Sequence, residues 1–324
     1  MLCVNAPVGT VYPYKDNAKA YLLAEGEAAV RFQKDDRDAF VPILFSWHTD
    51  APAASFTLRY GTTPELTDGV TVTLPGDTVE YGLYNLFKNT AYYWSLSDGR
   101  DTVTGSFVTA DLGPRVMAVD GIYNVRDAGG YPTAAGRTKQ GMVYRGGCME
   151  PAGPFDSLLS EAGKACMRDV LGIKTELDLR GIDPPEGPTA PSPIPGAERI
   201  DIRTDGYIPA FDLNDNFRRI FSLLAEESRY PVYMHCVGGA DRTGTVVFLL
   251  NALLGVSERD LRKDFEFTTF SVYGERNAAT QLQPFIDRFL CFAGDSWAEK
   301  AASYMRFIGV TEEEIAAIRR ILTV

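Results

Sequence analysis

The sequence predicts an all-β sandwich followed by an α/β domain with a mainly parallel central sheet flanked by helices. Two observations carry this prediction. Short runs of alternating apolar and polar residues, separated by turn residues, fill residues 28–109, and apolar strands alternate with amphipathic helices after Gly113. We therefore place the two domains at residues 1–112 and 113–324, joined by the stretch ADLGPRVMAVDG.

The strands expected in the first domain are FVPILFSWHT, SFTLRYG, VTVTL, TVEYGLYNL, AYYWSLS and TVTGSFVT. Glycine, proline and Asp-Gly turns separate them, a spacing typical of antiparallel strands in a small sandwich. The segment LYNLFKNTAYYWSLSDG followed by SFVTA resembles the fibronectin type III pattern, in which a leucine precedes a turn and then a strand tyrosine, here Tyr92 or Tyr93. This resemblance covers residues 25–110 and implies an immunoglobulin/fibronectin-like sandwich.

The second domain has the periodicity of helices and buried strands. Helices are expected at residues 155–171, 214–228, 243–254 and 311–322. Strands are expected at ELDL, ERIDI and PVYMH. The proline-rich stretch GIDPPEGPTAPSPIPGAE, between the first two of these strands, is expected to be a loop.

The stretch VYMHCVGGADRTGTVVFLL, residues 232–250, joins a predicted buried strand to a predicted helix. A loop at this position gathers backbone N–H groups and the positive end of the helix dipole, which together bind an anion. Gly238 and Gly239 permit the tight backbone that such a cradle needs, and Arg242 offers a planar fork to two phosphate oxygens. The residues expected to bind a phosphate are Val237, Gly238, Gly239, Ala240, Asp241 and Arg242.

Cys236 is the candidate nucleophile at the start of this loop. Cysteines at helix N-termini can have pKa values lowered to about 3.5–7.5, which yields a thiolate at neutral pH. Attack on a bound phosphate monoester would give a phosphocysteine, with Arg242 and the loop amides stabilising the transition state. Thr243 could hydrogen-bond the sulfur, and His235 is expected to orient the loop. The alternative is a buried structural thiol, because cysteine is among the most buried residue types.

The string HCVGGADRTG matches the HCx5R[ST] signature of cysteine-dependent protein tyrosine phosphatases, and its ending resembles their bacterial tyrosine and lipid phosphatase branch. NVRDAGGYPTAAGRTKQGMVYRGG, ELDLR and SYMRFIGVTEEEIAAIRRIL resemble further motifs of that branch. The resemblance covers residues 116–324 and implies an α/β phosphatase fold and a phosphocysteine mechanism that requires no metal or organic cofactor. The resemblance also makes Arg145 and Arg180, which would otherwise be ordinary charged residues, candidates for the site. It implies that Arg126 and Asp127 belong to the wall of the site. Ala240 stands where the branch often has lysine, which argues against multiply charged substrates.

Two aspartates compete for the role of general acid. Asp205, in IDIRTDGYIP, precedes Cys236 by 31 residues and resembles the mobile acid loop of dual-specificity phosphatases. Asp241 lies inside the cradle and resembles the loop aspartate of the bacterial branch. We favour Asp205, because an acid on a separate loop can approach the leaving oxygen from the side opposite the thiolate. The alternatives without a catalytic role are a turn aspartate at Asp205 and a surface ion pair at Arg126 and Asp127.

The sequence therefore predicts a phosphate-monoester hydrolase of the protein tyrosine phosphatase type, acting on a phosphorylated protein or a small phosphoester. A phosphoinositide or inositol polyphosphate phosphatase using the same loop is one alternative. The other is a catalytically silent phosphate-binding or adhesion protein, with a protein or glycan as the partner of its sandwich.

Composition limits the remaining classes. The 324 residues carry a formal net charge of −11, which gives no electrostatic reason to expect nucleic acid or an anionic membrane as a partner. No apolar run reaches the length of a membrane span, and MLCVNAPVGT lacks the pattern of a signal peptide. Five cysteines without CxxC spacing and two histidines suggest neither a disulfide framework nor a histidine-rich metal site. The sandwich resembles modules of extracytoplasmic bacterial proteins, which implies a secreted or cell-envelope location, with the reducing cytoplasm as the alternative.

Overall fold

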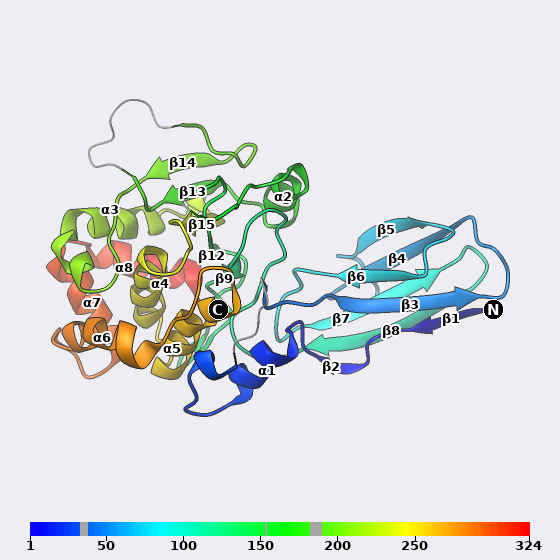
Figure 1. The fold of residues 1–324 in the computed structure, drawn as a ribbon, viewed down its shortest axis with the longest axis horizontal. Coiled ribbons are helices and arrows are strands. Elements are labelled where there is room, and N and C mark those ends of the chain that lie inside the picture. The colour runs from blue at the N-terminus through cyan, green and yellow to red at the C-terminus, as the bar shows by residue number, and fades with distance from the viewer. Residues whose placement is uncertain (33–37, 153, 182–189) are drawn as a thin grey trace. The chain divides into compact units, whose positions relative to one another are not determined.

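The computed structural model describes residues 1–32, 38–152, 154–181 and 190–324 (Figure 1). The chain divides into two compact units. The sandwich unit comprises Met1–Lys15 and Phe40–Leu112, and the α/β unit comprises Asp16–Ala39 and Gly113–Val324. Residues 16–39 thus interrupt the sandwich in sequence and belong to the α/β unit. Residues 182–189, within the proline-rich stretch, lie outside the described residues.

Two sheets form the sandwich unit. Their strands are β1 (Leu2–Asn5), β2 (Gly9–Val11), β3 (Ile43–Thr49), β4 (Ser55–Gly61), β5 (Val70–Pro75), β6 (Glu80–Leu83), β7 (Ala91–Ser97) and β8 (Thr102–Thr109). The orders are β1-β3-β6 in one sheet and β2-β8-β7-β4-β5 in the other. All pairs are antiparallel except β2 with β8. The short strands β1 and β2 extend the unit to the first residues of the chain.

Alternating side chains of these strands fill the core of the sandwich unit. Phe45 on β3 contacts Trp94 on β7 edge to face, with ring centroids 5.2 Å apart, and both are buried. Of the two tyrosines considered from the sequence, Tyr92 points into the core. Its ring stacks on Phe107, and its hydroxyl accepts a hydrogen bond of 2.9 Å from the backbone N–H of Phe87. The buried tyrosine therefore ties the preceding turn to the sheet.

The α/β unit is built on a five-stranded sheet among its described residues, with the order β14-β13-β15-β12-β9. Its strands are β9 (Arg126–Asp127), β12 (Val143–Gly146), β13 (Thr175–Asp178), β14 (Glu198–Asp201) and β15 (Val232–His235), beside a small hairpin of β10 (Pro132–Thr133) and β11 (Gly136–Arg137). Strands β14, β13, β15 and β12 run parallel, and β9 is antiparallel to β12. The carboxyl end of the central strand β15 is therefore flanked by the carboxyl ends of β13 and β12.

The α/β unit also contains helices and helical turns among its described residues. They are α1 (Asp16–Leu23), η1 (Ala29–Arg31), α2 (Glu161–Ala165), η2 (Cys166–Val170), η3 (Ile208–Asp212), α3 (Asn214–Leu224), η4 (Glu227–Arg229), α4 (Arg242–Leu253), α5 (Glu258–Glu266), η5 (Phe267–Phe270), η6 (Ala278–Leu282), α6 (Gln283–Phe289), α7 (Trp297–Phe307) and α8 (Glu312–Leu322). In the described part of the chain, each helix is too short or too polar to cross a membrane.

The helix expected at residues 155–171 is shorter than predicted. It begins only at Glu161, because the Ser160 hydroxyl accepts a hydrogen bond from the N–H of Gly163 and caps the first turn. Residues 155–160 run as irregular chain before this cap. The helix expected at residues 214–228 ends at Leu224, and a separate turn, η4, follows it.

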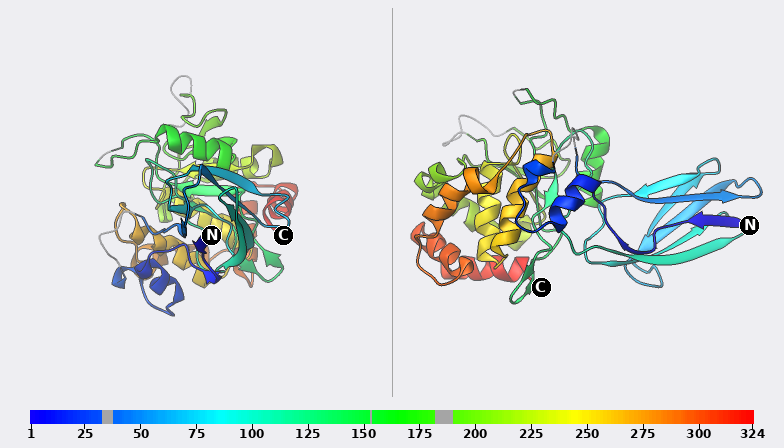
Figure 2. Two further views of the ribbon diagram at one scale, coloured as in Figure 1. Left: turned by 90° about the vertical axis from the view of Figure 1, so that its right-hand side faces the viewer. Right: turned by 60° about the horizontal axis from the view of Figure 1, so that its bottom comes forward.

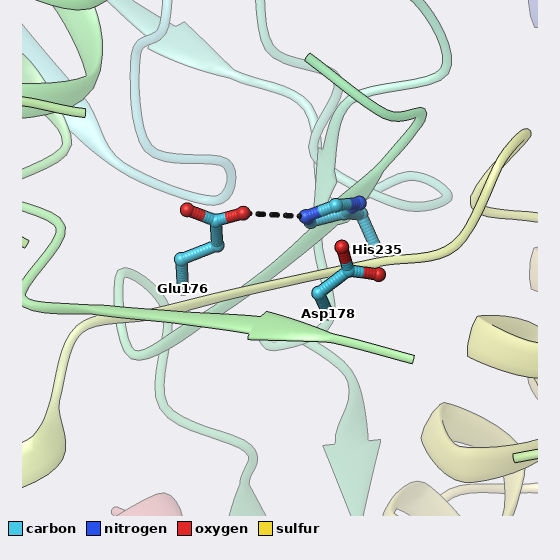
Figure 3. Close-up of side chains that lie close together, drawn as sticks. All are labelled: Glu176, Asp178 and His235. Carbon is cyan, nitrogen blue, oxygen red and sulfur yellow. Dashed lines mark hydrogen bonds and ion pairs between the residues drawn. The ribbon is translucent and has the colours of Figure 1, made fainter. Parts of the chain in front are cut away.

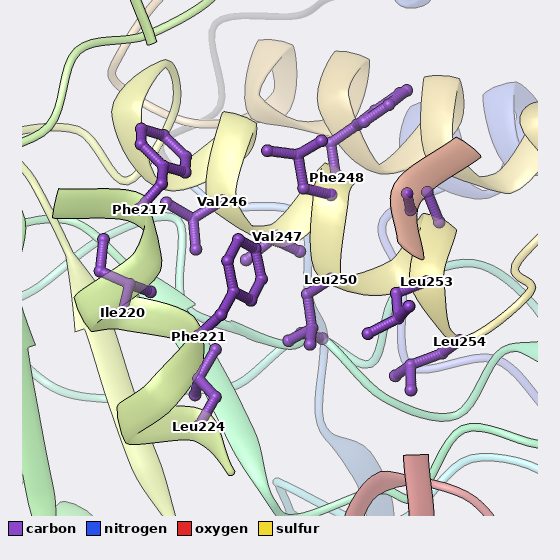
Figure 4. Packing of buried hydrophobic residues seen from close by; sticks show 14 of the residues in the cluster. Phe217, Ile220, Phe221, Leu224, Val246, Val247, Phe248, Leu250, Leu253 and Leu254 are labelled. Carbon is purple, nitrogen blue, oxygen red and sulfur yellow. The ribbon is translucent and has the colours of Figure 1, made fainter. Parts of the chain in front are cut away.

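Both faces of the central sheet are covered by apolar side chains. Val232 and Met234 of β15 join a core with α3, α4, α6, α7 and α8. Figure 4 shows part of it, with Phe217 and Phe221 of α3 facing residues of α4. On the opposite face, Tyr233 joins a smaller core that includes Tyr144 of β12 and Met167 of η2. Because β15 is buried on both sides, its end is a fixed point from which the next loop starts.

The segment of residues 16–31 packs against α5, as Figure 2 shows. The Lys263 ammonium donates to the carbonyls of Tyr21, Leu22 and Ala24, at 3.1, 2.7 and 2.7 Å, and so caps the C-terminal end of α1. The Glu266 carboxylate accepts from the Tyr21 hydroxyl at 3.0 Å. Two charged residues of α5 thus hold a segment that precedes them by more than 230 residues.

Candidate active site

The loop of residues 236–242, here called the cradle, connects β15 to α4. Both supports are rigid, since every residue of β15 is buried and α4 is buried from Thr243 to Leu253. Cys236, the first residue of the cradle, is 4% exposed. Arg242, the last, is the first residue of α4. The structure thus puts the cysteine at the end of the central strand and the arginine at a helix N-terminus, as the sequence predicts.

Two glycines let the cradle turn tightly. Gly239 has a φ of +62°, and a Cβ there would lie 2.1 Å from the carbonyl oxygen of Gly146. A Cβ on Gly238 would lie 2.9 Å from the ring of Tyr273. Side chains at these positions would collide with backbone or with a buried ring, so the cradle requires glycine at both.

The carbonyl groups of the cradle are turned outward. Those of residues 236–240 accept hydrogen bonds, in chain order, from His235 Nδ1 (3.1 Å), Cys148 N (2.9 Å), Asn124 Nδ2 (2.8 Å), Arg145 Nη2 (2.5 Å) and again Arg145 Nη2 (3.3 Å). In a trans peptide unit the N–H points away from the C=O. The N–H groups of residues 237–241 are therefore turned to the inner side of the cradle, where they can bind an anion.

A buried charge cluster lies behind the cradle. Arg145 donates from Nη1 to Asp264 Oδ2 at 2.5 Å, and Arg126 donates from Nε to Asp264 Oδ1 at 2.9 Å. Burial and the nearby Arg126 lower the pKa of Arg145 to about 10, so it still carries its charge at neutral pH. Burial alone would raise the pKa of Asp264, but the two arginines hold it below the ordinary value. Two cations against one anion leave a net positive charge, which favours an anion in the cradle.

His235 anchors the start of the cradle. Its Nε2 lies 3.0 Å from Glu176 Oε1 on the neighbouring strand, as Figure 3 shows, and its Nδ1 faces the carbonyl of Cys236. The ring thereby links β13 to the backbone of the candidate nucleophile.

Asp178 lies beside His235 and Glu176, and the ligand atoms of the three residues lie within 4.8 Å of one another (Figure 3). This spacing could suit a metal ion. The carboxylate of Asp178, however, already accepts from Arg180 and from Arg199 Nη2, at 2.7 and 2.6 Å. Guanidinium groups therefore occupy the place where a cation would bind, and the donor set does not fit a resident metal.

Arg180 and Asp127 have hydrogen-bond partners that lie outside the cradle. Arg180 is paired with Asp178 and with the carboxylate of Glu150. Asp127 is fully buried and accepts from Arg115 Nη1 at 2.9 Å and from the N–H of Gly129 at 2.8 Å. Arg126, 1% exposed, pairs with Asp264 instead. The surface ion pair considered for Arg126 and Asp127 is therefore wrong, because both side chains are buried and each has a different partner.

Asp241 is held by two side chains from outside the cradle. Arg276 donates to it from Nε and Nη2, each at 3.0 Å, and the Tyr207 hydroxyl donates to Oδ1. Burial and the charge of Asp241 raise the pKa of Tyr207, so the phenol remains a donor.

Asp205 lies in the segment between β14 and η3, which contacts the cradle at Asp241. Its neighbour Gly206 packs so closely that a Cβ there would lie 3.0 Å from the backbone carbon of Asp241. The Asp205 side chain is 44% exposed, and Arg203 lies 3.9 Å away. The two aspartates considered from the sequence are thus neighbours in space, one fixed by Arg276 and the other open to solvent.

Thr243 follows Arg242 in the first turn of α4. Its side chain is fully buried, and its hydroxyl has no hydrogen-bond partner among the residues that the structure describes. A buried hydroxyl in that state lowers the stability of the fold, and a ligand or a nearby sulfur would supply the missing partner.

The sequence analysis missed the residues that hold the cradle from behind and from the side: Asn124, Glu176, Asp264 and Arg276. Asn124 had a signal, since it begins the NVRDAGG motif, and its side-chain amide donates to the carbonyl of Gly238. Asp264 and Arg276 belong to no motif that the sequence analysis used.

Known proteins are similar to the part of the chain that contains the cradle. A family model described as "Tyrosine phosphatase family" matches residues 117–324. A curated protein of Cupriavidus necator, named "Putative tyrosine-protein phosphatase", is 29% identical over 175 residues, which cover 46% of this chain and 61% of that protein. This chain therefore matches less than two thirds of the relative's length. The core catalytic domain of a PP-IP phosphatase from S. cerevisiae, in complex with citrate, matches with a TM-score of 0.34 and 16% identity, over 55% of this chain and 96% of that one.

Proposed function

We propose, since this chain belongs to the tyrosine phosphatase family, that it hydrolyses phosphate monoesters, and phosphotyrosine in proteins above all, through a phosphocysteine on Cys236. One observation carries the proposal. Five consecutive carbonyls of the cradle are bound on its outer side, which turns the N–H groups toward the space beside Cys236. That is the arrangement a tetrahedral dianion requires.

The first half of the reaction transfers the phosphoryl group to sulfur. The Cys236 thiolate attacks phosphorus, a sulfur–phosphorus bond forms, and the bond from phosphorus to the leaving oxygen breaks. Arg242 and the inward N–H groups stabilise the charge on the equatorial oxygens. Asp205 gives its proton to the leaving oxygen, so that a neutral alcohol or phenol departs.

The second half releases phosphate. Asp205, now a carboxylate, takes a proton from water as the water oxygen attacks phosphorus. The sulfur–phosphorus bond breaks, inorganic phosphate leaves, and the thiolate is restored. The buried Thr243 hydroxyl has no partner among the described residues, so it is available to donate to the sulfur and to make the thiolate a better leaving group.

The preference for an aryl substrate rests on what surrounds the cradle. The rings of Tyr273 and Tyr207 border it, the first in contact with Gly238 and the second through Asp241. Aromatic side chains suit the ring of phosphotyrosine. Arg276, a cation beside the cradle, is neutralised by Asp241 and so contributes little attraction for a second phosphate. Comparing turnover of phosphotyrosine peptides with that of inositol phosphates tests this preference directly.

The test of the reaction is hydrolysis of para-nitrophenyl phosphate by the wild type and by Cys236→Ser, each with and without chelator and vanadate. The exposed thiol of Cys291 provides a matched control in Cys291→Ser. We expect wild-type and Cys291→Ser activity that resists chelator and is blocked by vanadate, and no activity in Cys236→Ser. An inactive wild type, or an active Cys236→Ser variant, would overturn the proposal and favour an anion-binding protein.

A further inference from the structure

Tyr207 has a backbone conformation that residues with a side chain rarely adopt. Its φ is +61° and its ψ is −138°, close to a region that only glycine populates readily. Strained residues of this kind persist only where their surroundings hold them, and they cluster at functional sites. The contacts of Tyr207 therefore indicate what the strained conformation maintains.

Three contacts hold Tyr207 in this conformation. Its backbone N–H donates to the Thr245 hydroxyl of α4 at 2.9 Å, and its own hydroxyl donates to Asp241 Oδ1. Its ring packs edge to face against Phe265 of α5, with the ring centroids 6.0 Å apart. Tyr207 thus contacts two helices and the cradle, which all lie far from it in the sequence.

The Thr245 hydroxyl links Tyr207 to the cradle a second time. It accepts from the N–H of Tyr207 and donates to the backbone carbonyl of Asp241, at 2.9 Å each. Thr245 is 1% exposed. A buried hydroxyl that is used both as donor and as acceptor fixes both of its partners.

The residues that lead to Tyr207 are fixed as well. The carbonyl of Arg203 accepts from Asn216 Nδ2 of α3 at 2.9 Å. The N–H of Thr204 donates to the carbonyl of Leu179, directly after β13, at 3.1 Å. The chain between β14 and Tyr207 is therefore held before it reaches the cradle.

Gly206 is the residue through which this segment lies against the end of the cradle. A Cβ on Gly206 would lie 3.0 Å from the backbone carbon of Asp241 and 3.3 Å from the backbone nitrogen of Arg242. At these two residues the cradle becomes the first turn of α4. Movement of residues 203–207 would therefore remove a contact from the end of the cradle.

We propose that Tyr207 is a positioning residue that holds residues 203–207 against the end of the cradle before phosphate binds, and that it thereby raises the affinity of the cradle for phosphate. A binding site that is already ordered loses less conformational freedom when its ligand arrives. This inference rests on the proposed function, because phosphate binding in the cradle is its premise. It does not depend on which residue protonates the leaving group.

The experiment compares vanadate binding by the wild type, Tyr207→Phe and Tyr230→Phe. Tyr207→Phe keeps the ring and removes the contact with Asp241. Tyr230→Phe is the matched control, since it removes a hydrogen bond of 2.6 Å from another buried hydroxyl to the carbonyl of Leu224. We expect Tyr207→Phe to bind vanadate about tenfold more weakly and Tyr230→Phe to bind it as the wild type does. Hydrogen exchange in residues 203–207 should be faster in Tyr207→Phe alone, and KM for para-nitrophenyl phosphate should change more than kcat.

Thr245 provides a second test that leaves Tyr207 in place. Thr245→Val keeps the shape of the side chain without its hydroxyl and should also bind vanadate about tenfold more weakly. Thr245→Ser keeps the hydroxyl and should restore binding to within about twofold of the wild type.

Wild-type affinity for vanadate in a folded Tyr207→Phe variant would overturn the inference, and so would equal losses in Thr245→Ser and Thr245→Val. Equal losses in Tyr207→Phe and Tyr230→Phe would also overturn it, because lower stability would then explain both. Failure of the proposed function is distinguishable, since the wild type would then have no phosphatase activity or Cys236→Ser would keep it.

Discussion

Arg145 and Asp264 form a buried ion pair, with 2.5 Å between Nη1 and Oδ2, directly behind the loop that holds Cys236. The same guanidinium donates from Nη2 to the carbonyls of Gly239 and Ala240. One side chain thus links α5 to the backbone that is proposed to bind phosphate.

Two substitutions of Arg145 should distinguish the effect of its positive charge from that of its hydrogen-bonding geometry. Arg145→Lys keeps the cation, but a single ammonium cannot reach Asp264 and both carbonyls together, so we expect weaker vanadate binding and a lower kcat. Arg145→Met leaves Asp264 without this partner and should lower the free energy of unfolding by about 3–5 kcal/mol. Urea denaturation and vanadate titration measure the two effects. Arg115→Lys, in the buried pair with Asp127, is the control, and a loss of vanadate binding equal to that of Arg145→Lys would contradict the linkage.

Gly239→Ala should disrupt the cradle. The φ of +62° costs a residue with a side chain about 1–2 kcal/mol, and the Cβ would also lie 2.1 Å from the carbonyl oxygen of Gly146. We expect loss of activity and of vanadate binding. Gly196→Ala shares the positive φ, at +82°, but meets nothing within 4 Å, so it should cost stability only. Equal activity losses in the two variants would show that backbone strain alone, and not the contact with Gly146, explains the glycine.

Lys263→Met should loosen residues 16–31. The substitution removes the donor from three carbonyls at the end of α1, with an expected cost of about 1–3 kcal/mol for acceptors left unpaired. Hydrogen exchange in residues 16–31 should become faster. Lys300→Met is a matched control, since Lys300 donates to the carbonyls of Leu290 and Phe292 at 2.9 Å each. Unchanged exchange at residues 16–31 in Lys263→Met would show that the segment is held by other contacts.

Asp178 should make the free energy of unfolding depend on pH in the acidic range. Burial alone would raise its pKa, but Arg180 and His235 hold it below the ordinary value of 3.8. As the pH falls below that value, the unfolded chain binds the proton first, so the free energy of unfolding decreases until the pH has passed the lower pKa of the folded state. Urea denaturation of the wild type between about pH 5 and about pH 2 should show this decrease, and Asp178→Asn should show a shallower one. If the free energies of unfolding of the wild type and of Asp178→Asn fell equally with pH, Asp178 would not be the source of the dependence.

The sequence predicted the parts of the fold that have a local pattern. SFTLRYG, AYYWSLS and TVTGSFVT form strands with the expected bounds, because their side chains alternate between core and surface. The helix after Arg242 also begins and ends within one residue of its expected position. Residues 16–39 could not be assigned to the α/β unit, since their partners, Lys263 and Glu266, lie far along the chain.

The candidate site likewise has a part that the sequence could predict and a part that it could not. The cradle lies in one continuous string, so its residues could be identified together. The residues that hold it come from distant segments, with Arg145 and Asp264 separated by 119 positions. No local pattern reports such a contact, and the same holds for Arg276, which donates to Asp241 from 35 positions further along the chain.

The central claim is that Cys236 carries the phosphoryl group. It is tested most directly by quenching the protein in acid during turnover of an aryl phosphate and measuring the mass of the peptide that contains Cys236. We predict a peptide heavier by one phosphoryl group on sulfur, seen in the wild type and absent from Cys236→Ser. A wild type that hydrolyses the substrate while this peptide stays unmodified under every quench time, or a phosphoryl group found on another residue, would contradict the account.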